Sequence, residues 1–373
     1  MKVNFPIISQ HATWIGVNPV QGCPKRCKYC FLQSQNKTGI KPEILMGEEE
    51  TIIELLNSPH YTEESILSFF TNTDAFATKD NMNFLENILL ECDKHNIYNV
   101  KTFITKCSIP DKFIDLFEKL IKKGHKIIVY LSYSGLDNTI ERGISHEKIR
   151  ENFIRLSDRN IPIIHYWRPF VPQNSQKHKL EEVFNFVSKY STASVIAGLK
   201  IEEMYYDNLD FWPELTNNNR KKILMAEGIW PKGVIEFFEE LKANNNQYPF
   251  FQSNSCALAH ALKKPDSNAF NNTKICNFNN CPLEQRELCN SFYKNISFSE
   301  KEFIKTMNLL GYDTDKINYK LTDANEIHIF GITMSVADQS FITQKFHKRV
   351  LVNKLATDIY WNTSVNGSEP LEI

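Results

Sequence analysis

Short apolar runs alternate with amphipathic stretches along the first two thirds of the chain. A short run of consecutive apolar residues is typical of a strand that is buried on both faces. Between the runs, apolar residues recur at helical spacing, most clearly over 111–123. Strands that alternate with helices form parallel βαβ units, and about six or seven such units predict an α/β fold, a complete or partial (β/α) barrel of the TIM type. The predicted strands are 13–17, 65–70, 100–105, 126–131, 161–166, 193–201 and 248–251.

The rest of the chain has a different composition. Residues 253–295 are rich in cysteine and too poor in apolar residues to form a core of their own. Residues 296–373 predict a small α+β unit, with a helix near 303–310 and strands at 326–330 and 350–355. We therefore predict three domains, which are a barrel over 1–252, a cysteine-rich metal segment over 253–295 and an α+β appendage over 296–373.

Charge and composition narrow the setting in which the protein works. The 373 residues include 43 basic and 44 acidic side chains, a net charge of -1, so no global field attracts nucleic acid or an anionic membrane. The first residues lack the apolar core of a signal peptide, and no apolar run is long enough to span a bilayer. We therefore expect a cytoplasmic protein without a membrane partner. In a reducing compartment, nine cysteines are better explained by metal ligation than by disulfides.

Three of these cysteines, Cys23, Cys27 and Cys30, follow the first predicted strand within one short loop. They are separated by three and then two residues, so they can hold three corners of a 4Fe-4S cluster and leave the fourth iron without a protein ligand. An open iron can bind a substrate or a cofactor. Zinc is the alternative, but structural zinc usually takes its ligands as two spaced pairs, and no histidine lies near this loop. The loop therefore favours an iron–sulfur cluster.

With Tyr29 directly before its last cysteine, the CxxxCxxC loop resembles the signature of the radical S-adenosylmethionine (radical SAM) superfamily. The resemblance implies that the three cysteines hold a 4Fe-4S cluster and that SAM chelates its open iron. It also implies that one electron, from a reductant such as flavodoxin or ferredoxin, cleaves SAM to a 5'-deoxyadenosyl radical, which abstracts hydrogen from a substrate. The protein would then be an enzyme with radical chemistry of the lyase or oxidoreductase type.

Residues at the ends of the next strands resemble one branch of this superfamily, the spore photoproduct lyase-like or DNA repair photolyase-like branch. Thr73 and Asp74 follow the second strand, Lys106 the third and Ser132 the fourth. In that branch, the residues at the second strand end contact the amino group of SAM. A lysine at the third strand end and a serine at the fourth contact the carboxylate and the ribose of SAM. The resemblance therefore implies that these four residues, together with Tyr29, bind the cofactor.

Other positions either match or differ from the lyase-like branch. Glu141 also resembles the branch's glutamate, so the resemblance adds it to the expected cofactor-binding residues, and the Pro-x-x-Pro sequence at 169–172 resembles the branch as well. The lyase itself, however, carries a hydrogen-donating cysteine where this chain has Thr71, which disfavours spore photoproduct repair. Cys107, just past the third strand, is a candidate hydrogen donor, although free cysteines are usually buried as small apolar residues. On its residues alone, the segment 71–74 is equally typical of a turn that caps the following helix.

Four cysteines beyond the predicted barrel are spaced by 19, 4 and 7 intervening residues. Four thiolates are the full set of ligands for a second 4Fe-4S cluster or for an all-cysteine zinc site. The spacing lacks the paired CxxC units of zinc ribbons, which favours iron, and unligated cysteines are the third interpretation. The four residues are Cys256, Cys276, Cys281 and Cys289.

Two features bear on the substrate. Arg168 closes the fifth strand, after His165, where a guanidinium group could hold a planar or anionic group; the alternative is packing with one salt bridge. The basic run at 345–349 contains a phenylalanine and could meet phosphates, although such runs are more often a solvated helix face. We therefore predict a radical SAM enzyme acting on a nucleic acid or nucleotide. The alternatives are an enzyme that modifies a peptide or protein with the help of the second cluster, and a non-catalytic iron–sulfur protein.

Overall fold

The computed structural model describes residues 4–352 and 371–373, except 202, 204–205, 207–208, 217, 219, 227, 245–246 and 323–324. Its centre is an eight-stranded sheet in the order β1-β2-β6-β7-β8-β10-β11-β13. β1 and β2 form an antiparallel hairpin, and every later neighbour is parallel. The strands are β1 (Ile8–Gln10), β2 (Ile15–Val17), β6 (Leu67–Phe69), β7 (Lys101–Thr105), β8 (Ile127–Leu131), β10 (Ile163–Phe170), β11 (Ala193–Gly198) and β13 (Phe250–Phe251).

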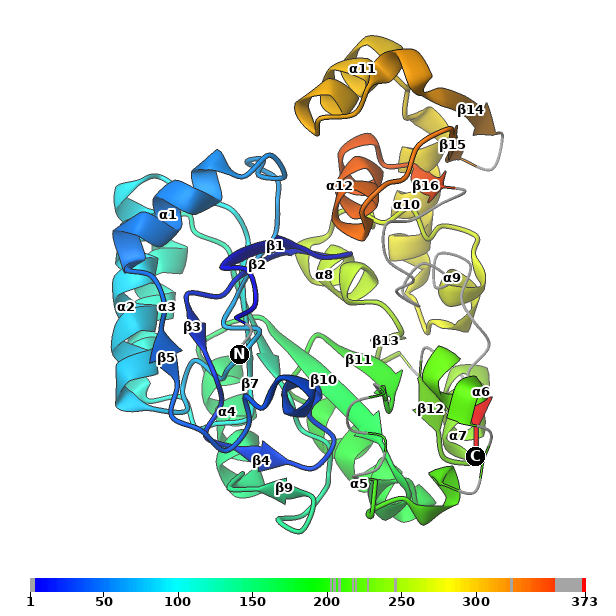
Figure 1. The fold of residues 1–373 in the computed structure, drawn as a ribbon. Helices are drawn as coiled ribbons and strands as arrows, with labels where there is room; N and C mark the ends of the chain where they lie inside the picture. The colour runs from blue at the N-terminus through cyan, green and yellow to red at the C-terminus, as the bar shows by residue number, and fades with distance from the viewer. Residues whose placement is uncertain are drawn as a thin grey trace.

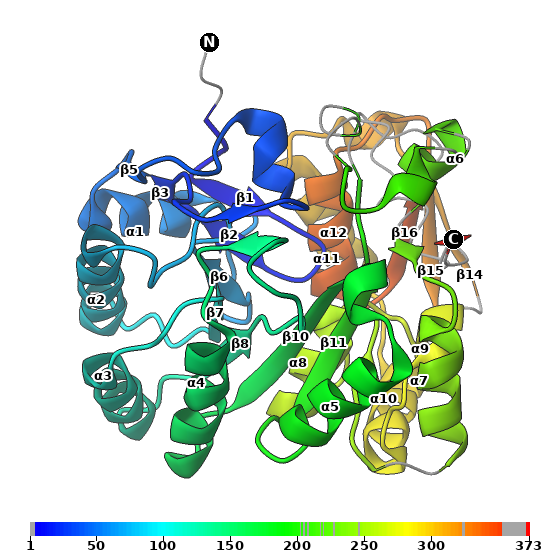
Figure 2. The ribbon, with the colours of Figure 1, turned by 90° about the horizontal axis from the view of Figure 1, so that it is seen from below.

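Helices follow these strands in turn and cover the outer face of the sheet (Figures 1 and 2). α3 illustrates why they form, because its buried residues Phe113, Phe117 and Leu120 recur at helical spacing while its lysines face solvent. Each parallel strand pairs with the next one along the chain, which is the strand order of a (β/α) barrel. The helices of this layer are α1 (Glu48–Asn57), α2 (Lys79–Lys94), α3 (Asp111–Lys122), α4 (His146–Asp158), α5 (Lys177–Val187) and α7 (Val234–Ala243).

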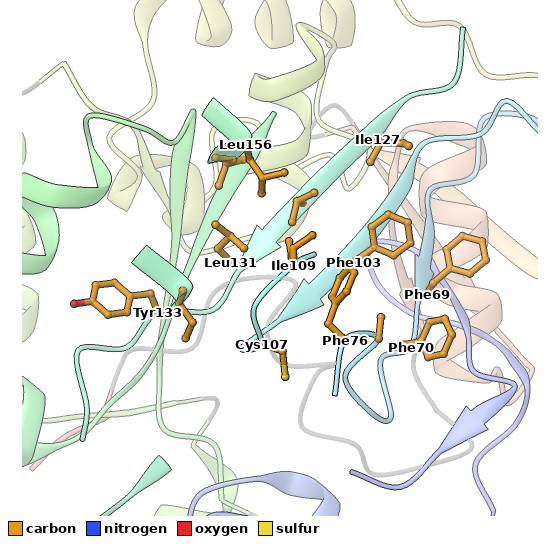
Figure 3. Close-up of a cluster of buried hydrophobic side chains, with 14 of the residues drawn as sticks. Phe69, Phe70, Phe76, Phe103, Cys107, Ile109, Ile127, Leu131, Tyr133 and Leu156 are labelled. Atoms are coloured by element: carbon orange, nitrogen blue, oxygen red, sulfur yellow. The ribbon is translucent and has the colours of Figure 1, made fainter. Parts of the chain in front are cut away.

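Alternate side chains of each strand belong to two different cores. In β8, Ile127, Val129 and Leu131 pack with the outer helices, in the cluster seen in Figure 3. Ile128 and Tyr130 point to the other, inner face and pack with residues of α8 (Asn254–Leu262). α8 contacts β10, β11 and β13, so this helix occupies the inner face of the sheet.

The sheet is open rather than closed, because no pairing between β1 and β13 is found among the described residues. The C-terminal unit lies at the β1 edge, where the Gln344 side chain of α12 (Val336–Phe346) donates to the carbonyl oxygen of Ala12 at 2.7 Å. His60, beyond α1, binds Asp338 at 2.7 Å. α8 and α12 therefore lie near the two edges that a complete barrel would join (Figure 1). The prediction of a partial barrel is confirmed.

The C-terminal unit is a three-stranded sheet covered by two helices. The strand predicted at 350–355 begins at residue 349, and 353–355 lie outside the described residues. Helices of the cysteine-rich segment connect this unit to the barrel. These elements are α9 (Lys274–Phe278), α10 (Leu283–Asn295), α11 (Glu300–Leu309), β14 (Asn318–Thr322), β15 (Glu326–Phe330), α12 (Val336–Phe346) and β16 (Arg349–Val352).

Short ribbons and turns lie beyond the carboxyl ends of the parallel strands. The pairs are β3 (Val20–Gln21) with β5 (Glu43–Ile44), β4 (Arg26–Cys27) with β9 (Glu141–Arg142), and β12 (Ile229–Trp230) with β17 (Leu371–Glu372). The remaining helical pieces are η1 (Phe31–Gln35), η2 (Pro172–Asn174), η4 (Pro213–Leu215), α6 (Arg220–Met225) and η5 (Thr314–Lys316). Among the described residues, none of the helices has the length and apolar character needed to cross a membrane.

Candidate active site at the carboxyl ends of the strands

The cysteine loop follows β2 and is fixed by its own backbone. Gly22 starts it with φ +93°, a conformation that suits glycine. The backbone N–H of Cys23 donates to the carbonyl of Lys37 at 2.8 Å, and the Gln33 side chain donates to the carbonyl of Cys27 at 2.8 Å. These bonds form because the chain turns back on itself through η1, and they hold all three cysteines within one compact loop.

The thiols of this loop are poorly hydrated and influence one another. Cys27 is buried, and Cys23 and Cys30 are partly buried. Burial, and next the nearby carboxylate of Asp74, raise the pKa of Cys23 to about 12. Burial raises the pKa of Cys27 as well; the charge of Lys106 opposes this rise, and the charges of Glu141, Cys30 and Cys23 add to it. Three thiolates could coexist in this loop only with a compensating positive charge, and a cationic iron–sulfur group supplies one, so the donor set fits such a group.

The end of β6 connects the loop to the neighbouring strand. The Thr73 hydroxyl donates to the carbonyl of Gly22. The two oxygens of Asp74 accept from the Thr105 hydroxyl and the Lys106 backbone N–H, each at 2.8 Å. The same carboxylate accepts from the backbone N–H of Phe76 at 3.0 Å, so the turn expected from the residues alone is also present. Asp74 therefore joins the ends of β6 and β7 directly beside Cys23.

Glu141 is the centre of the polar network at this face. Its side chain is fully buried, and its Oε1 accepts from Lys106 Nζ at 2.7 Å and from the Tyr29 hydroxyl. Its Oε2 is 2.7 Å from Nε2 of His146. Burial alone would raise the pKa of Glu141, but the charge of Lys106 and the hydrogen bonds from His146, Lys106 and Tyr29 outweigh it and lower the pKa to about 2. Cys27 lies directly opposite Glu141 in the β4–β9 ribbon.

Lys106 connects the remaining predicted cofactor residues. Its Nζ lies 3.4 Å from the carbonyl of Ser132 and 5.7 Å from the centre of the Tyr29 ring. Ser132 is buried after the end of β8, and its N–H donates to the carbonyl of Thr105 at 2.9 Å. The structure thus brings Tyr29, Thr73, Asp74, Lys106, Ser132 and Glu141 to one place beside the cysteine loop.

Cys107 lies in the outer core, close to the site. It is 7% exposed at the end of β7 (Figure 3), and its backbone carbonyl accepts from the Asn152 side chain at 2.8 Å. Burial, and next the charge of Asp74, raise the pKa of its thiol, so the thiol keeps its proton. The role of this thiol as a hydrogen donor to a substrate stays a prediction.

The residues at the end of β10 alternate between the outer and the inner face of the sheet. His165 is fully buried on the outer side, where Nδ1 lies 2.8 Å from the Ser194 hydroxyl and Nε2 lies 2.8 Å from the carbonyl of Tyr133. Burial lowers the pKa of His165 to about 3, so it is a neutral structural residue. Tyr166 and Arg168 point to the inner side, and the Arg168 guanidinium donates to the Tyr166 hydroxyl at 2.9 Å.

The four later cysteines, from three helices and a turn, line one small cavity together with Asp266. Cys256 is on α8, Cys276 on α9, Cys281 precedes α10 and Cys289 is on α10. The backbone N–H of Asp266 and the side chain of Gln285 lie 3.5 Å from the Cys289 sulfur as donors. Burial raises the pKa of Cys281 to about 12, although the Arg286 guanidinium beside it acts in the opposite direction.

Neither group of cysteines is shown to bind a metal. Among the described residues, no set of three or more histidine, cysteine, aspartate or glutamate side chains is arranged to hold a metal ion. Both metal sites therefore stay predictions.

The basic run at 345–349 makes contacts within the C-terminal unit. Lys348 Nζ donates to the Asn325 side chain at 2.5 Å, and Arg349 binds Glu326. Lys345 lies 5.7 Å from the centre of the Phe341 ring. Lys345 is exposed at the end of α12, whereas Lys348 and Arg349 lie beyond that helix and bind partners within the same unit.

His146 is the site residue that sequence reasoning missed. It is the first residue of α4, directly after the N-cap Ser145, whose side chain accepts from the N–H of Lys148. A helix start five residues after Glu141 places the imidazole beside that carboxylate. The Ser-His-Glu-Lys sequence is a recognisable helix N-terminus, but nothing in it indicates that the histidine turns back toward Glu141.

Known family profiles do not match the sequence, and neither do curated proteins. The structure is similar to that of spore photoproduct lyase in complex with a dinucleoside spore photoproduct, with 11% identity and a TM-score of 0.42, over 55% of this chain and 62% of that chain. It is also similar to that of SuiB from Streptococcus suis, with 11% identity and a TM-score of 0.43, over 68% of this chain and 52% of that chain. The chain thus spans less than two thirds of either protein.

Proposed function

We propose that this protein is a radical SAM enzyme. The observation that supports this most directly is the position of the buried Glu141, which is paired in one ribbon with Cys27 and binds both Lys106 and Tyr29. A loop that held only a structural metal would have no need of a lysine and a buried carboxylate at its side. When bound, the 4Fe-4S group supplies one electron to SAM, whose sulfonium C–S bond breaks to give methionine and a 5'-deoxyadenosyl radical.

The residues at the strand ends would bind and orient SAM. Asp74 has lone pairs beyond those used by Thr105 and Lys106, so its carboxylate can also accept from the amino group of SAM. The ammonium group of Lys106 has three donors, of which Glu141 takes one, and another can bind the SAM carboxylate. Ser132 is proposed to contact the ribose. Glu141 would act by holding Lys106 and Tyr29 in place.

We also propose a second 4Fe-4S group at Cys256, Cys276, Cys281 and Cys289, with zinc as the alternative. Support comes from the single cavity that all four line and from the N–H groups directed at the Cys289 sulfur, since such donors stabilise thiolates. Iron and zinc analysis of the C23A/C27A/C30A variant tests this. About four irons per chain are expected, the content of one cluster; stoichiometric zinc without iron would decide for zinc, and neither metal would refute the site.

For the substrate, we propose a nucleic acid or nucleotide that contacts Arg168. This guanidinium lies against the Tyr166 ring on the inner face of β10, an arrangement that can hold a phosphate or a planar base. Residues 345–349 add no support, because Lys348 and Arg349 bind partners in their own unit. Binding of single-stranded DNA and RNA, followed by fluorescence anisotropy at rising salt, tests the idea. Salt-sensitive binding that R168Q weakens is expected, and its absence would favour a peptide or protein substrate.

The enzymatic proposal itself is tested by anaerobic reconstitution followed by electron paramagnetic resonance. The reduced wild-type protein should give a 4Fe-4S signal that changes when SAM is added, because SAM would bind the open iron. In the C23A/C27A/C30A variant this SAM-sensitive signal should be lost. A signal indifferent to SAM in the wild-type protein would favour a non-catalytic iron–sulfur protein.

A further inference from the structure

The ribbon formed by β4 and β9 has two faces of opposite character. Cys27 and Glu141 are directly opposite each other, and both are buried. Arg26 and Arg142 form the other opposed pair, and both are exposed. Directly opposite residues of an antiparallel pair lie on the same face. One face of the ribbon therefore carries a cysteine of the loop and the central carboxylate of the site, and the other carries two guanidinium groups.

The arginine pair is unfavourable for folding, because like charges directly opposite each other on neighbouring strands destabilise the pairing. Within the described part of the chain, no acidic side chain forms an ion pair with either guanidinium. The other two cations of the loop are engaged, since Lys25 Nζ donates to the carbonyl of Gly143 at 2.6 Å and Lys28 binds Asp210 at 2.8 Å. Two unneutralised arginines at this position need an explanation outside the fold.

We propose that Arg26 and Arg142 form the docking surface for an acidic one-electron donor protein. This proposal rests on the proposed function, which requires an electron at the cysteine loop. A partner that covers the arginine face would lie on the opposite side of the β4–β9 ribbon from Cys27. The reduced centre of the partner would give up one electron and be oxidised; Cys23, Cys27 and Cys30 would hold the group that accepts this electron, and that group would supply it for cleavage of the SAM C–S bond.

The charge of the whole chain makes such a local surface necessary. With a net charge of -1, the protein as a whole does not attract an acidic partner. Two exposed guanidinium groups on one face create a local positive potential, which raises the rate of encounter and orients the partner toward the loop. Such an interaction weakens as salt rises, because exposed charges are screened.

The test compares the charge-reversed variant R26E/R142E with K126E/K301E, which reverses two exposed lysines elsewhere and changes the net charge by the same amount. Reduced flavodoxin is the probe. Its binding is followed by flavin fluorescence at low and at high salt, and SAM cleavage is measured with flavodoxin and, separately, with dithionite, a small reductant that needs no docking surface. For R26E/R142E we expect binding to weaken about tenfold at low salt and the flavodoxin-driven rate to fall accordingly, with an unchanged dithionite-driven rate. K126E/K301E should match the wild-type protein.

Each other outcome has a distinct meaning. Wild-type flavodoxin binding by R26E/R142E would overturn the proposal, and so would loss of its dithionite-driven rate, since the arginines would then support the loop itself. An intact flavodoxin-driven rate in R26E/R142E would also overturn it. If the wild-type protein cleaves no SAM with dithionite, the proposed function fails, whatever flavodoxin binding shows.

Discussion

Replacing Glu141 by glutamine should destabilise the protein far more than an ordinary change from carboxylate to amide. Glutamine has almost the same size, so packing is kept while the charge that faces Lys106 is lost. One side-chain oxygen of Glu141 accepts from both Lys106 and Tyr29, and the other lies 2.7 Å from His146. The substitution leaves the Lys106 ammonium, only 17% exposed, without its anionic partner.

The magnitude follows from the pKa of the carboxyl group. The environment lowers the pKa of Glu141 from its ordinary 4.5 to about 2, which corresponds to about 3 kcal/mol of stability at neutral pH. Loss of one partner from a buried ion pair typically costs about 3–5 kcal/mol, which agrees. Because the folded-state pKa is the lower one, this stability is present above pH 4.5 and is lost as the pH falls toward 2.

Urea unfolding of the metal-free protein, followed by tryptophan fluorescence, measures this effect. The control is E54Q, which removes an exposed carboxylate from α1. At pH 7, E141Q should be about 3 kcal/mol less stable than E54Q, and the gap should narrow as the pH falls below 4.5. If the two variants unfold at the same urea concentration at pH 7, the carboxylate does not hold this network together.

Two further predictions concern Lys106 and His165. K106A should weaken SAM binding by about 1.5–3 kcal/mol, the value of a hydrogen bond to a charged group, while the iron content stays that of the wild-type protein. Calorimetric titration of SAM into the reconstituted protein measures this affinity. An unchanged affinity would remove Lys106 from the cofactor site. Burial lowers the pKa of His165 to about 3, so below pH 6.5 the unfolded chain binds a proton that the folded chain does not, and wild-type stability should fall by up to about 1.4 kcal/mol per pH unit. In the same urea assay, the stability of H165Q should depend less on pH between pH 6.5 and 5 than that of the wild-type protein. If stability changes with pH equally in both proteins, this histidine does not titrate as its burial requires.

The parallel strands and their helices were predictable because their signal is local. Each strand of β6, β7, β8, β10, β11 and β13 is a run of buried residues, and helices such as α3 keep their apolar residues on one stripe. The hairpin partner β1 was not predicted, since Ile8–Gln10 is a short, mixed segment whose pairing depends on the chain turning back. An open edge with an antiparallel strand is therefore a feature that only the folded chain reveals.

The contacts of the site were predictable only in part. The strand ends could be located from where each apolar run stops, and resemblance to the lyase-like branch then selected Asp74, Lys106 and Ser132 among the residues there. That Glu141 binds Lys106 depends on a ribbon of two residues per strand, too short to leave an apolar pattern. Side chains alternate along β10, so only two of residues 165–168 can face the inner side, and packing decides that these are Tyr166 and Arg168.

The place of α8 shows how an apparently coreless segment is stabilised. Residues 253–295 are too polar to form their own core, yet Ala257 and Leu258 are fully buried against the inner face of the barrel sheet. Small side chains let the helix approach the strands closely, and they give no strong sequence signal of burial. The segment is thus stabilised by packing against the core of the barrel, and the sequence alone does not indicate this packing.

Product analysis of SAM cleavage tests the proposed radical SAM activity most directly. Anaerobically reconstituted, reduced wild-type protein should convert SAM to equal amounts of 5'-deoxyadenosine and methionine, and the C23A/C27A/C30A variant should form neither. C92A, which removes a thiol buried in the core at α2, should cleave SAM like the wild-type protein. Absence of 5'-deoxyadenosine from cluster-replete, fully reduced wild-type protein would contradict the central claim.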